Sequence, residues 1–168
     1  VKTSKEAHKL VEEFMLLANK QVAIFLGKPK EDGGKGITSL YRTHDQPDPA
    51  KLDIFSVFID KFGYKVDLNQ PEQIAKNINK LLGDIRLKNE YSLIQSMAIR
   101  SMAKAVYETE NIGHYGLAFE HYTHFTSPIR RYADLVIHRI LQSAIEKRKH
   151  RYEKGLEQIC KHISANER

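Results

Sequence analysis

Apolar residues recur at helical spacing along most of this 168-residue chain, and Gly or Pro interrupts each run. A spacing of three and four residues places such side chains on one face of a helix, and Gly and Pro end helices. The sequence therefore predicts a mainly helical chain whose helices share a core. The predicted helices are residues 3–27, 49–63, 71–83, 89–108 and 127–147, with a final helix after residue 151.

Local signals mark where several of these helices begin. Residues 3–6 read Thr-Ser-Lys-Glu, which has the form of a capping box. Asp48 can cap the second helix, and Pro49 suits its first position. Either Asn69 or Gln70 precedes Pro71 at the start of the third helix.

Two stretches have sequence patterns that are typical of strands. Apolar and polar residues alternate from Tyr115 to Phe125, which is the period of a half-buried strand. Residues 37–42 predict a second short strand. The fold class is therefore α+β, predominantly helical, with one or two short strands.

Composition narrows the class of protein. Hydrophobic residues make up 41% of the chain, enough to form a core. The single cysteine, Cys160, excludes a disulfide within the chain and a zinc site built from cysteines, and it suits a reducing compartment such as the cytoplasm. No apolar run is long enough for a membrane span. The net charge of +6 suits a polyanionic partner.

The segment from Thr126 to Asp134 contains the densest cluster of candidate functional residues. Ser127 and Pro128 predict a helix start, so Arg130 and Arg131 would stand in its first turn. A cation there is unfavourable, because a helix N-terminus is already partly positive. The arrangement makes sense if both guanidinium groups bind a phosphate. Asp134, at a distance of three to four residues, can pair with either arginine.

Other polar and aromatic residues are candidates for contacts with nucleic acid. Tyr122 and its aromatic neighbours could stack on bases, or they could belong to the core. Glu12 and Asn19 lie on the same helix face and could contact ribose or base edges if that face lines a groove. The spacing of the histidines matches no metal-ligand pattern.

Two of these segments resemble the signature of the ribonuclease II/ribonuclease R family, namely Gly113 to Leu117 and Thr126 to Asp134. Residues 7–19 and 41–47 resemble two further blocks of that family in the same order, and the sequence looks most like the bacterial ribonuclease R branch. The resemblance implies that residues 1–168 are the C-terminal part of a larger catalytic domain, cut at both ends. It also implies a monomeric, cytoplasmic parent protein with cold-shock and S1-type modules.

The family resemblance also implies an activity. The parent protein would be a processive 3′→5′ exoribonuclease that hydrolyses single-stranded RNA to nucleoside 5′-monophosphates by a two-metal mechanism with Mg²⁺. Arg130 would be the catalytic arginine, and Asp134 would support it. The aspartates that hold the metals are expected before Val1, so this chain alone would contain no metal ligands and would be inactive. The residues expected to bind RNA are Glu12, Asn19, Tyr122, Ser127, Arg131 and Tyr132.

Two alternatives remain open from the residues alone. The chain could be a non-catalytic RNA- or phosphate-binding helical module that uses Arg130, Arg131 and the basic stretch 147–151. It could instead be a structural helical domain in which Asp134 simply pairs with an arginine. For the basic stretch, a solvated loop between helices is the favoured interpretation.

Overall fold

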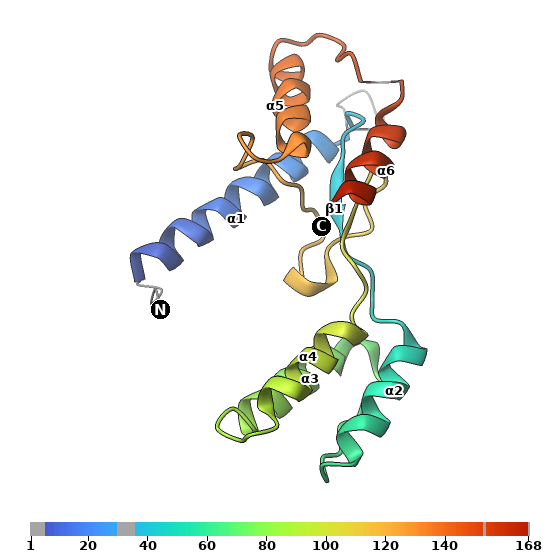
Figure 1. Ribbon diagram of the computed structural model, residues 1–168. Coiled ribbons are helices and arrows are strands. Elements are labelled where there is room, and N and C mark those ends of the chain that lie inside the picture. The colour runs from blue at the N-terminus through green and yellow to red at the C-terminus, as the bar shows by residue number, and fades with distance from the viewer. Residues whose placement is uncertain (1–5, 30–35, 153, 168) are drawn as a thin grey trace. The chain divides into compact units, whose positions relative to one another are not determined.

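The computed structural model describes residues 6–29, 36–152 and 154–167. The chain divides into two compact units, and Figure 1 shows their elements. Unit 1 comprises residues 1–44 and 105–168, and unit 2 comprises residues 45–104. The capping box predicted at residues 3–6 lies outside the described residues, apart from Glu6.

Unit 2 consists of three helices around an apolar core. They are α2 (Pro49–Asp60), α3 (Pro71–Asp84) and α4 (Tyr91–Ser101). The predicted start of α2 is confirmed, since the Asp48 carboxylate accepts a hydrogen bond from the Ala50 backbone N–H at 3.0 Å. Gly63 follows the helix with a φ of +80°, a conformation that favours glycine. The core residues are Leu52, Phe55, Ile59, Ile74, Ile78, Leu81, Ile85, Ile94 and Ala98.

The long helix predicted for residues 89–108 is wrong. Helix α4 ends at Ser101, and Val106–Glu108 forms strand β2. The apolar spacing does continue past Met102, but Val106 and Tyr107 pair with the distant strand β1 (Tyr41–Thr43) instead of extending the helix. The strand predicted at residues 37–42 therefore exists in a shorter form, shifted toward the C-terminus.

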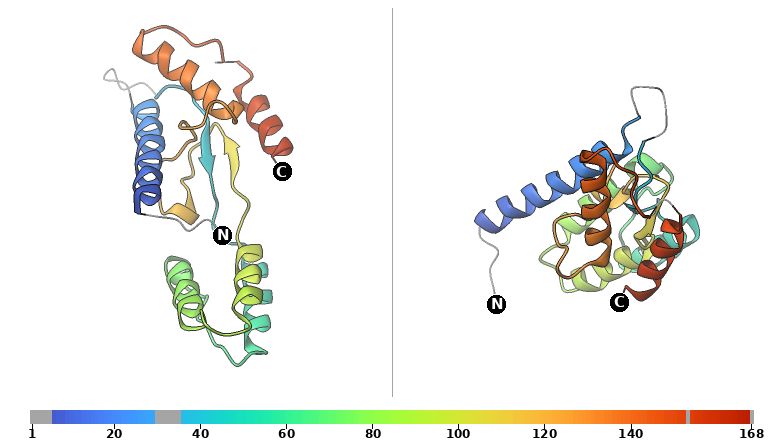
Figure 2. Two further views of the ribbon diagram at one scale, coloured as in Figure 1. Left: turned by 60° about the vertical axis from the view of Figure 1, so that its left-hand side comes forward. Right: turned by 90° about the horizontal axis from the view of Figure 1, so that it is seen from above.

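Unit 1 is built around that two-stranded antiparallel sheet. Arg42 lies opposite Tyr107 in the register. Three helices complete the unit: α1 (Glu6–Gly27), α5 (Tyr132–Ile145) and α6 (Leu156–Asn166). Figure 2 shows the two strands side by side between α1 and α6. The core residues are Leu26, Leu40, Tyr107, Ala133, Val136, Ile137, Ile140, Tyr152, Leu156 and Cys160.

The strand predicted from Tyr115 to Phe125 is also wrong. Exposure does alternate along its first half, but the backbone folds back on itself there. Tyr115–Leu117 is a single 3₁₀ turn, and the His114 N–H donates to the Phe119 carbonyl oxygen at 2.8 Å. Farther on, the Tyr122 carbonyl oxygen accepts from the Arg42 N–H at 2.9 Å, so this segment runs beside β1 without forming a ladder.

Two further observations concern the character of the helices and the state of the cysteine. None of the helices in the described ranges has the length and apolar character needed to cross a membrane. Cys160 is a free thiol buried in the core of unit 1, where burial raises its pKa to about 11.

Candidate functional site

A turn at residues 127–131 precedes α5 and presents the two adjacent arginines. The Ser127 carbonyl oxygen accepts hydrogen bonds from the backbone N–H groups of Arg130 (3.3 Å) and Arg131 (3.1 Å). Helix α5 begins at Tyr132, so the prediction that Ser127 caps it and that both arginines lie in its first turn is wrong. The physical reason is Asp134, whose carboxylate accepts from the Ser127 N–H at 2.7 Å and bends the chain into this turn.

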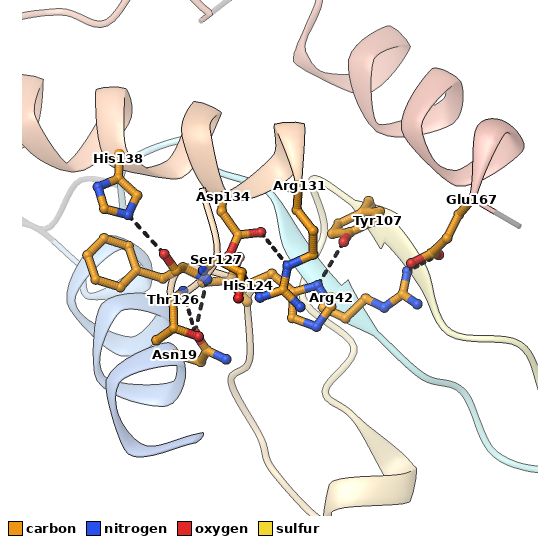
Figure 3. A network of polar contacts seen from close by, with 12 residues as sticks. Asn19, Arg42, Tyr107, His124, Thr126, Ser127, Arg131, Asp134, His138 and Glu167 are labelled. Atoms are coloured by element: carbon orange, nitrogen blue, oxygen red, sulfur yellow. Dashed lines mark hydrogen bonds and ion pairs between the residues drawn. The ribbon is translucent and has the colours of Figure 1, made fainter. Parts of the chain in front are cut away.

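Asp134 is the anchor of the turn. The residue is fully buried, and besides Ser127 it accepts from Nε and Nη2 of Arg131 at 2.8 and 2.9 Å. Figure 3 shows this pairing at the start of α5. Three charge-assisted hydrogen bonds offset the loss of hydration of a buried carboxylate. The predicted pairing of Asp134 with one of the two arginines is confirmed, and the partner is Arg131.

Arg130 has very different surroundings from Arg131. Its side chain is exposed, and its guanidinium group has no hydrogen-bond or ion-pair partner among residues 6–29, 36–152 and 154–167. The guanidinium group of Arg131 is held by a carboxylate, whereas that of Arg130 keeps its hydrogen-bond donors free. An unpaired arginine on a fixed turn is suited to bind an anion in a bidentate manner.

Asn19 of α1 fastens the segment that leads into the turn. Its Oδ1 accepts from the backbone N–H groups of Phe125 (2.9 Å) and Thr126 (3.2 Å), and its Nδ2 donates to the Tyr122 hydroxyl at 3.1 Å. Asn19 and Glu12 differ in exposure, because Asn19 is 3% exposed and holds backbone groups within the unit, whereas Glu12 is exposed. The two residues do lie on one side of α1, but the described residues cover that side only from about Asn19 onward.

Three successive backbone N–H groups, those of residues 125–127, are thus held by two buried side chains from different helices. On the other side of this segment, the Phe125 carbonyl oxygen contacts His138 Nε2 at 2.9 Å, and the two rings stack at 4.1 Å. Figure 3 shows Asn19 and His138 on either side of the segment. The base of the turn is therefore fixed by hydrogen bonds, which hold the backbone from which Arg130 projects.

A second polar pair lies beside Arg131 and was missed by sequence reasoning. The Tyr107 hydroxyl lies 2.7 Å from His124 Nδ1. Burial raises the pKa of Tyr107 to about 12, so the hydroxyl is protonated at neutral pH and donates. Burial, and then the positive charges of Arg131 and Arg42, lower the pKa of His124 to about 4. His124 is therefore neutral, with Nδ1 as the acceptor and the proton on Nε2.

A groove of about 750 Å³ opens between the turn and α6. We call it the α6 groove. Arg130, Arg131 and Tyr132 line one wall, and Gln158, His162 and Asn166 stand in a row along the other. Glu167, at the end of this row, forms an ion pair with Arg42 at 2.7 Å. The sequence predicted the helix at α6. Nothing in the sequence of α6, however, indicates that its polar residues lie opposite Arg130, Arg131 and Tyr132.

The residues predicted to bind RNA thus fall into two groups. Glu12, Arg130 and Tyr132 present side chains to solvent, and Tyr132 is 50% exposed. Asn19, Tyr122 and Arg131 are engaged in contacts within the unit, as is the backbone of Ser127. The described residues contain no group of three or more His, Cys, Asp or Glu side chains placed to hold a metal ion, so they do not fit a Mg²⁺ site.

Comparison with known proteins gives one consistent result. Residues 1–147 match the RNB domain family. The chain is 39% identical over 165 residues to ribonuclease R of Aquifex aeolicus, covering 96% of this chain and 22% of that protein. It is 39% identical over 143 residues to ribonuclease R of Escherichia coli, covering 84% of this chain and 17% of that protein. The chain therefore spans about a fifth of the length of these relatives.

Solved structures agree with the sequence comparison. The apo form of Mycoplasma genitalium RNase R superposes with a TM-score of 0.81 at 26% identity, over 98% of this chain and 26% of that one. Yeast Ssd1, described as a pseudonuclease, superposes with a TM-score of 0.71 at 27% identity, over 94% of this chain and 20% of that one. The match of the family over most of the chain bears out the resemblance seen in the sequence, and this chain belongs to the RNB domain family.

Proposed function

We propose that this chain is part of a processive 3′→5′ exoribonuclease that hydrolyses single-stranded RNA to nucleoside 5′-monophosphates. Its relatives of similar sequence are named ribonuclease R, and a related structure is M. genitalium RNase R in complex with ribose methylated single-stranded RNA. The proposal covers a parent protein that is cytoplasmic and monomeric and that carries cold-shock and S1-type modules.

One observation carries the proposal at the level of residues. Arg130 is exposed and has no partner among the described residues, while Arg131 beside it is bound to buried Asp134. Because Asp134 neutralises Arg131, Arg130 is the cation of this pair whose hydrogen-bond donors stay available, and a planar guanidinium group on a fixed turn suits a phosphate. We propose that this anion is the scissile phosphate, whose charge grows as the phosphodiester bond is attacked.

The proposed roles of the remaining residues follow from their exposure. Glu12 and Tyr132 would contact RNA directly, since their side chains are open to solvent. Asn19 and Asp134 would act as positioning residues that hold the turn through its backbone. Arg131 would complete the support through its pairing with Asp134.

The proposed chemistry includes Mg²⁺ ions bound outside the described residues, since these residues do not fit a metal site. Such ions would supply Lewis-acid activation when bound. The part of this chain is to grip the phosphate through Arg130 and to keep that guanidinium group in place.

The test is a gel assay of the full-length parent protein on 5′-labelled single-stranded RNA with Mg²⁺. We expect progressive trimming from the 3′ end by the wild type. The variant Arg130→Ala should lose on the order of 100-fold or more in kcat, with a smaller loss of RNA affinity. The matched control is Arg86→Ala, which removes an exposed arginine of unit 2 and should leave kcat unchanged. An unchanged kcat for Arg130→Ala would overturn the role of Arg130.

A second candidate function is a non-catalytic RNA-binding module. The observation that favours it is the similarity to yeast Ssd1, which is described as a pseudonuclease although it shares this fold. In that case the wild type would shift RNA in a binding gel without trimming it. The binding would weaken with added salt, because the phosphate contacts release counterions.

A further inference from the structure

We propose that the α6 groove is a nucleotide subsite, which takes the nucleotide next to the phosphate held by Arg130. The inference deepens the proposed function and rests on it. Arg130 and Tyr132 stand on one wall of the groove, and Gln158 and His162 on the other. Helix α6 lies beyond the residues that match the RNB domain family, so the match assigns nothing to it.

The size and openness of the groove suit such a ligand. Its volume of about 750 Å³ lies within the usual range for small-molecule sites. Tyr132 is 50% exposed at its edge, and an exposed tyrosine ring can stack on any base. Ile163 on the opposite wall is half-buried and adds an apolar surface. The groove therefore offers flat and apolar contacts to a base.

The charge of the groove favours a ligand with a single negative group near one end. Arg131 is neutralised by Asp134, and Glu167 is neutralised by Arg42. Arg130 is then the remaining charge among these wall residues, and it stands where the turn meets the groove. A nucleotide has this distribution, with one phosphate attached to an otherwise uncharged base and sugar.

The polar row along α6 supplies hydrogen-bonding groups for the base or sugar. Gln158, His162 and Asn166 are four residues apart, so they stand above one another on one face of the helix. Asn166 donates to the His162 carbonyl oxygen at 2.8 Å, whereas the Gln158 side chain has no partner among the residues the structure describes. Amide and imidazole groups both donate and accept, which suits the edges of bases and the ribose hydroxyls.

The first test compares two double variants of the full-length protein. Gln158→Ala with His162→Ala removes groove residues, while Glu157→Ala with Lys161→Ala removes the ion pair one residue earlier on the same helix. Both changes remove two exposed side chains four residues apart, and the control removes one charge of each sign. The matched control pair contributes little to stability, because surface ion pairs are weak.

The measurement is the Kd of a fluorescein-labelled single-stranded RNA by anisotropy, with EDTA present to prevent cleavage. We expect the groove pair to raise the Kd by about fivefold or more and the control pair by less than about twofold. Hydrogen exchange in the peptides that cover residues 156–166 checks that α6 remains folded in each variant. Equal affinities for the two double variants would overturn the proposal.

A second measurement locates the RNA without any substitution in the groove. RNA that carries 4-thiouridine near its 3′ end is crosslinked to the wild type, and the attached peptides are identified by mass spectrometry. Crosslinks to peptides that contain Tyr132 or α6 support the subsite. Crosslinks confined to other peptides would contradict it, and would indicate that another part of the parent protein covers the groove.

The two proposals can fail separately. If the wild type trims RNA while the groove pair keeps its affinity, the subsite is wrong and the exoribonuclease stands. If the wild type binds RNA without trimming it and the groove pair loses affinity, the subsite stands and the exoribonuclease is wrong.

Discussion

The two units of this chain differ in what they bury. Six of the seven buried polar residues among the described ones belong to unit 1: Asn19, Ser39, Thr43, Thr123, Asp134 and His150. The seventh is Ser101 in unit 2, and it donates to the Ala98 carbonyl oxygen within its own helix. In unit 1, Asn19 instead joins α1 to a backbone segment more than 100 residues away, and Asp134 accepts from the Ser127 N–H in the turn that precedes its own helix. Unit 2 is therefore held by apolar packing, whereas unit 1 also uses buried polar groups to fix the backbone before Arg130.

The largest effect should come from the apolar core of unit 2. Phe55→Ala removes a fully buried ring, and we expect the opening free energy of α2 and α4 to fall by about 3 to 5 kcal/mol. Native-state hydrogen exchange, read peptide by peptide in the full-length protein, measures this loss. Val57→Ala, on the same helix but 65% exposed, is the control and should change it by less than about 0.5 kcal/mol. An equal loss of protection in residues 122–131 would show that the two units share one core.

The next effect tests the buried carboxylate of unit 1. Asp134→Ala leaves the Ser127 N–H and the Arg131 guanidinium group without their acceptor, and should destabilise residues 125–137 by about 3 kcal/mol. The same exchange experiment measures it. Asp134→Asn keeps one acceptor oxygen and should lose less. Protection that is unchanged in Asp134→Ala would mean that packing alone forms the turn.

Asn19 should have a somewhat smaller effect. Asn19→Ala leaves the N–H groups of Phe125 and Thr126 without an acceptor, so we expect a loss of about 2 kcal/mol in the protection of that segment. In the RNA assay, kcat should fall more than affinity, because Arg130 is displaced rather than removed. Glu12→Ala on the exposed part of α1 is the control, and it should leave exchange unchanged. A loss of affinity without faster exchange in Asn19→Ala would instead support direct contact between Asn19 and RNA.

The smallest predicted effect is a loss of stability at low pH that is confined to unit 1. All eight histidines lie in unit 1, since residues 45–104 contain none. Burial lowers the pKa of both His114 and His124 from 6.5 to about 4. The unfolded chain takes up these protons first, so their contribution to stability is complete above about pH 6.5 and is lost as the pH falls toward 4.

Both histidines are partly exposed, so we expect unit 1 to lose about 1 kcal/mol between pH 7 and pH 5. The groups around His124 that set this behaviour are Tyr107, Arg42, Arg131, Asp134 and His114. Hydrogen exchange at the two pH values, corrected for intrinsic rates, measures the loss. A comparable loss in unit 2 would show that histidine titration is not its cause.

The same difference between the units explains which helices and strands could be predicted from the sequence. In unit 2 the cap at Asp48 and the apolar spacing of α2 and α3 are local signals, and the predicted helices are confirmed. In unit 1 the decisive partners are distant in sequence. No residue near Val106 indicates that it pairs with Thr43. The apolar spacing therefore predicted that α4 would continue through β2.

The candidate site was predicted in its residues but not in its geometry. The motif from Thr126 to Asp134 predicted the pairing of Asp134 with an arginine, which the structure confirms, and a role for Arg130, which stays a prediction. The position of the helix start was missed, because the Asp134 carboxylate binds the Ser127 backbone seven residues earlier. The role of Asn19 as an anchor depends on partners more than 100 residues away, for which a sequence offers no spacing rule.

The division of unit 1 into two stretches has a consequence for how the chain folds during synthesis. All of unit 2 is contiguous, so it can fold as soon as residue 104 has emerged. Strand β1 must wait for β2 across about 60 residues, which a ribosome adds in about 3 to 12 seconds. Asn19 waits longer still for Phe125. Residues 6–29 and 36–44 therefore spend this interval without their partners from residues 105–167, and the turn at residues 127–131 is among the last parts of unit 1 to form.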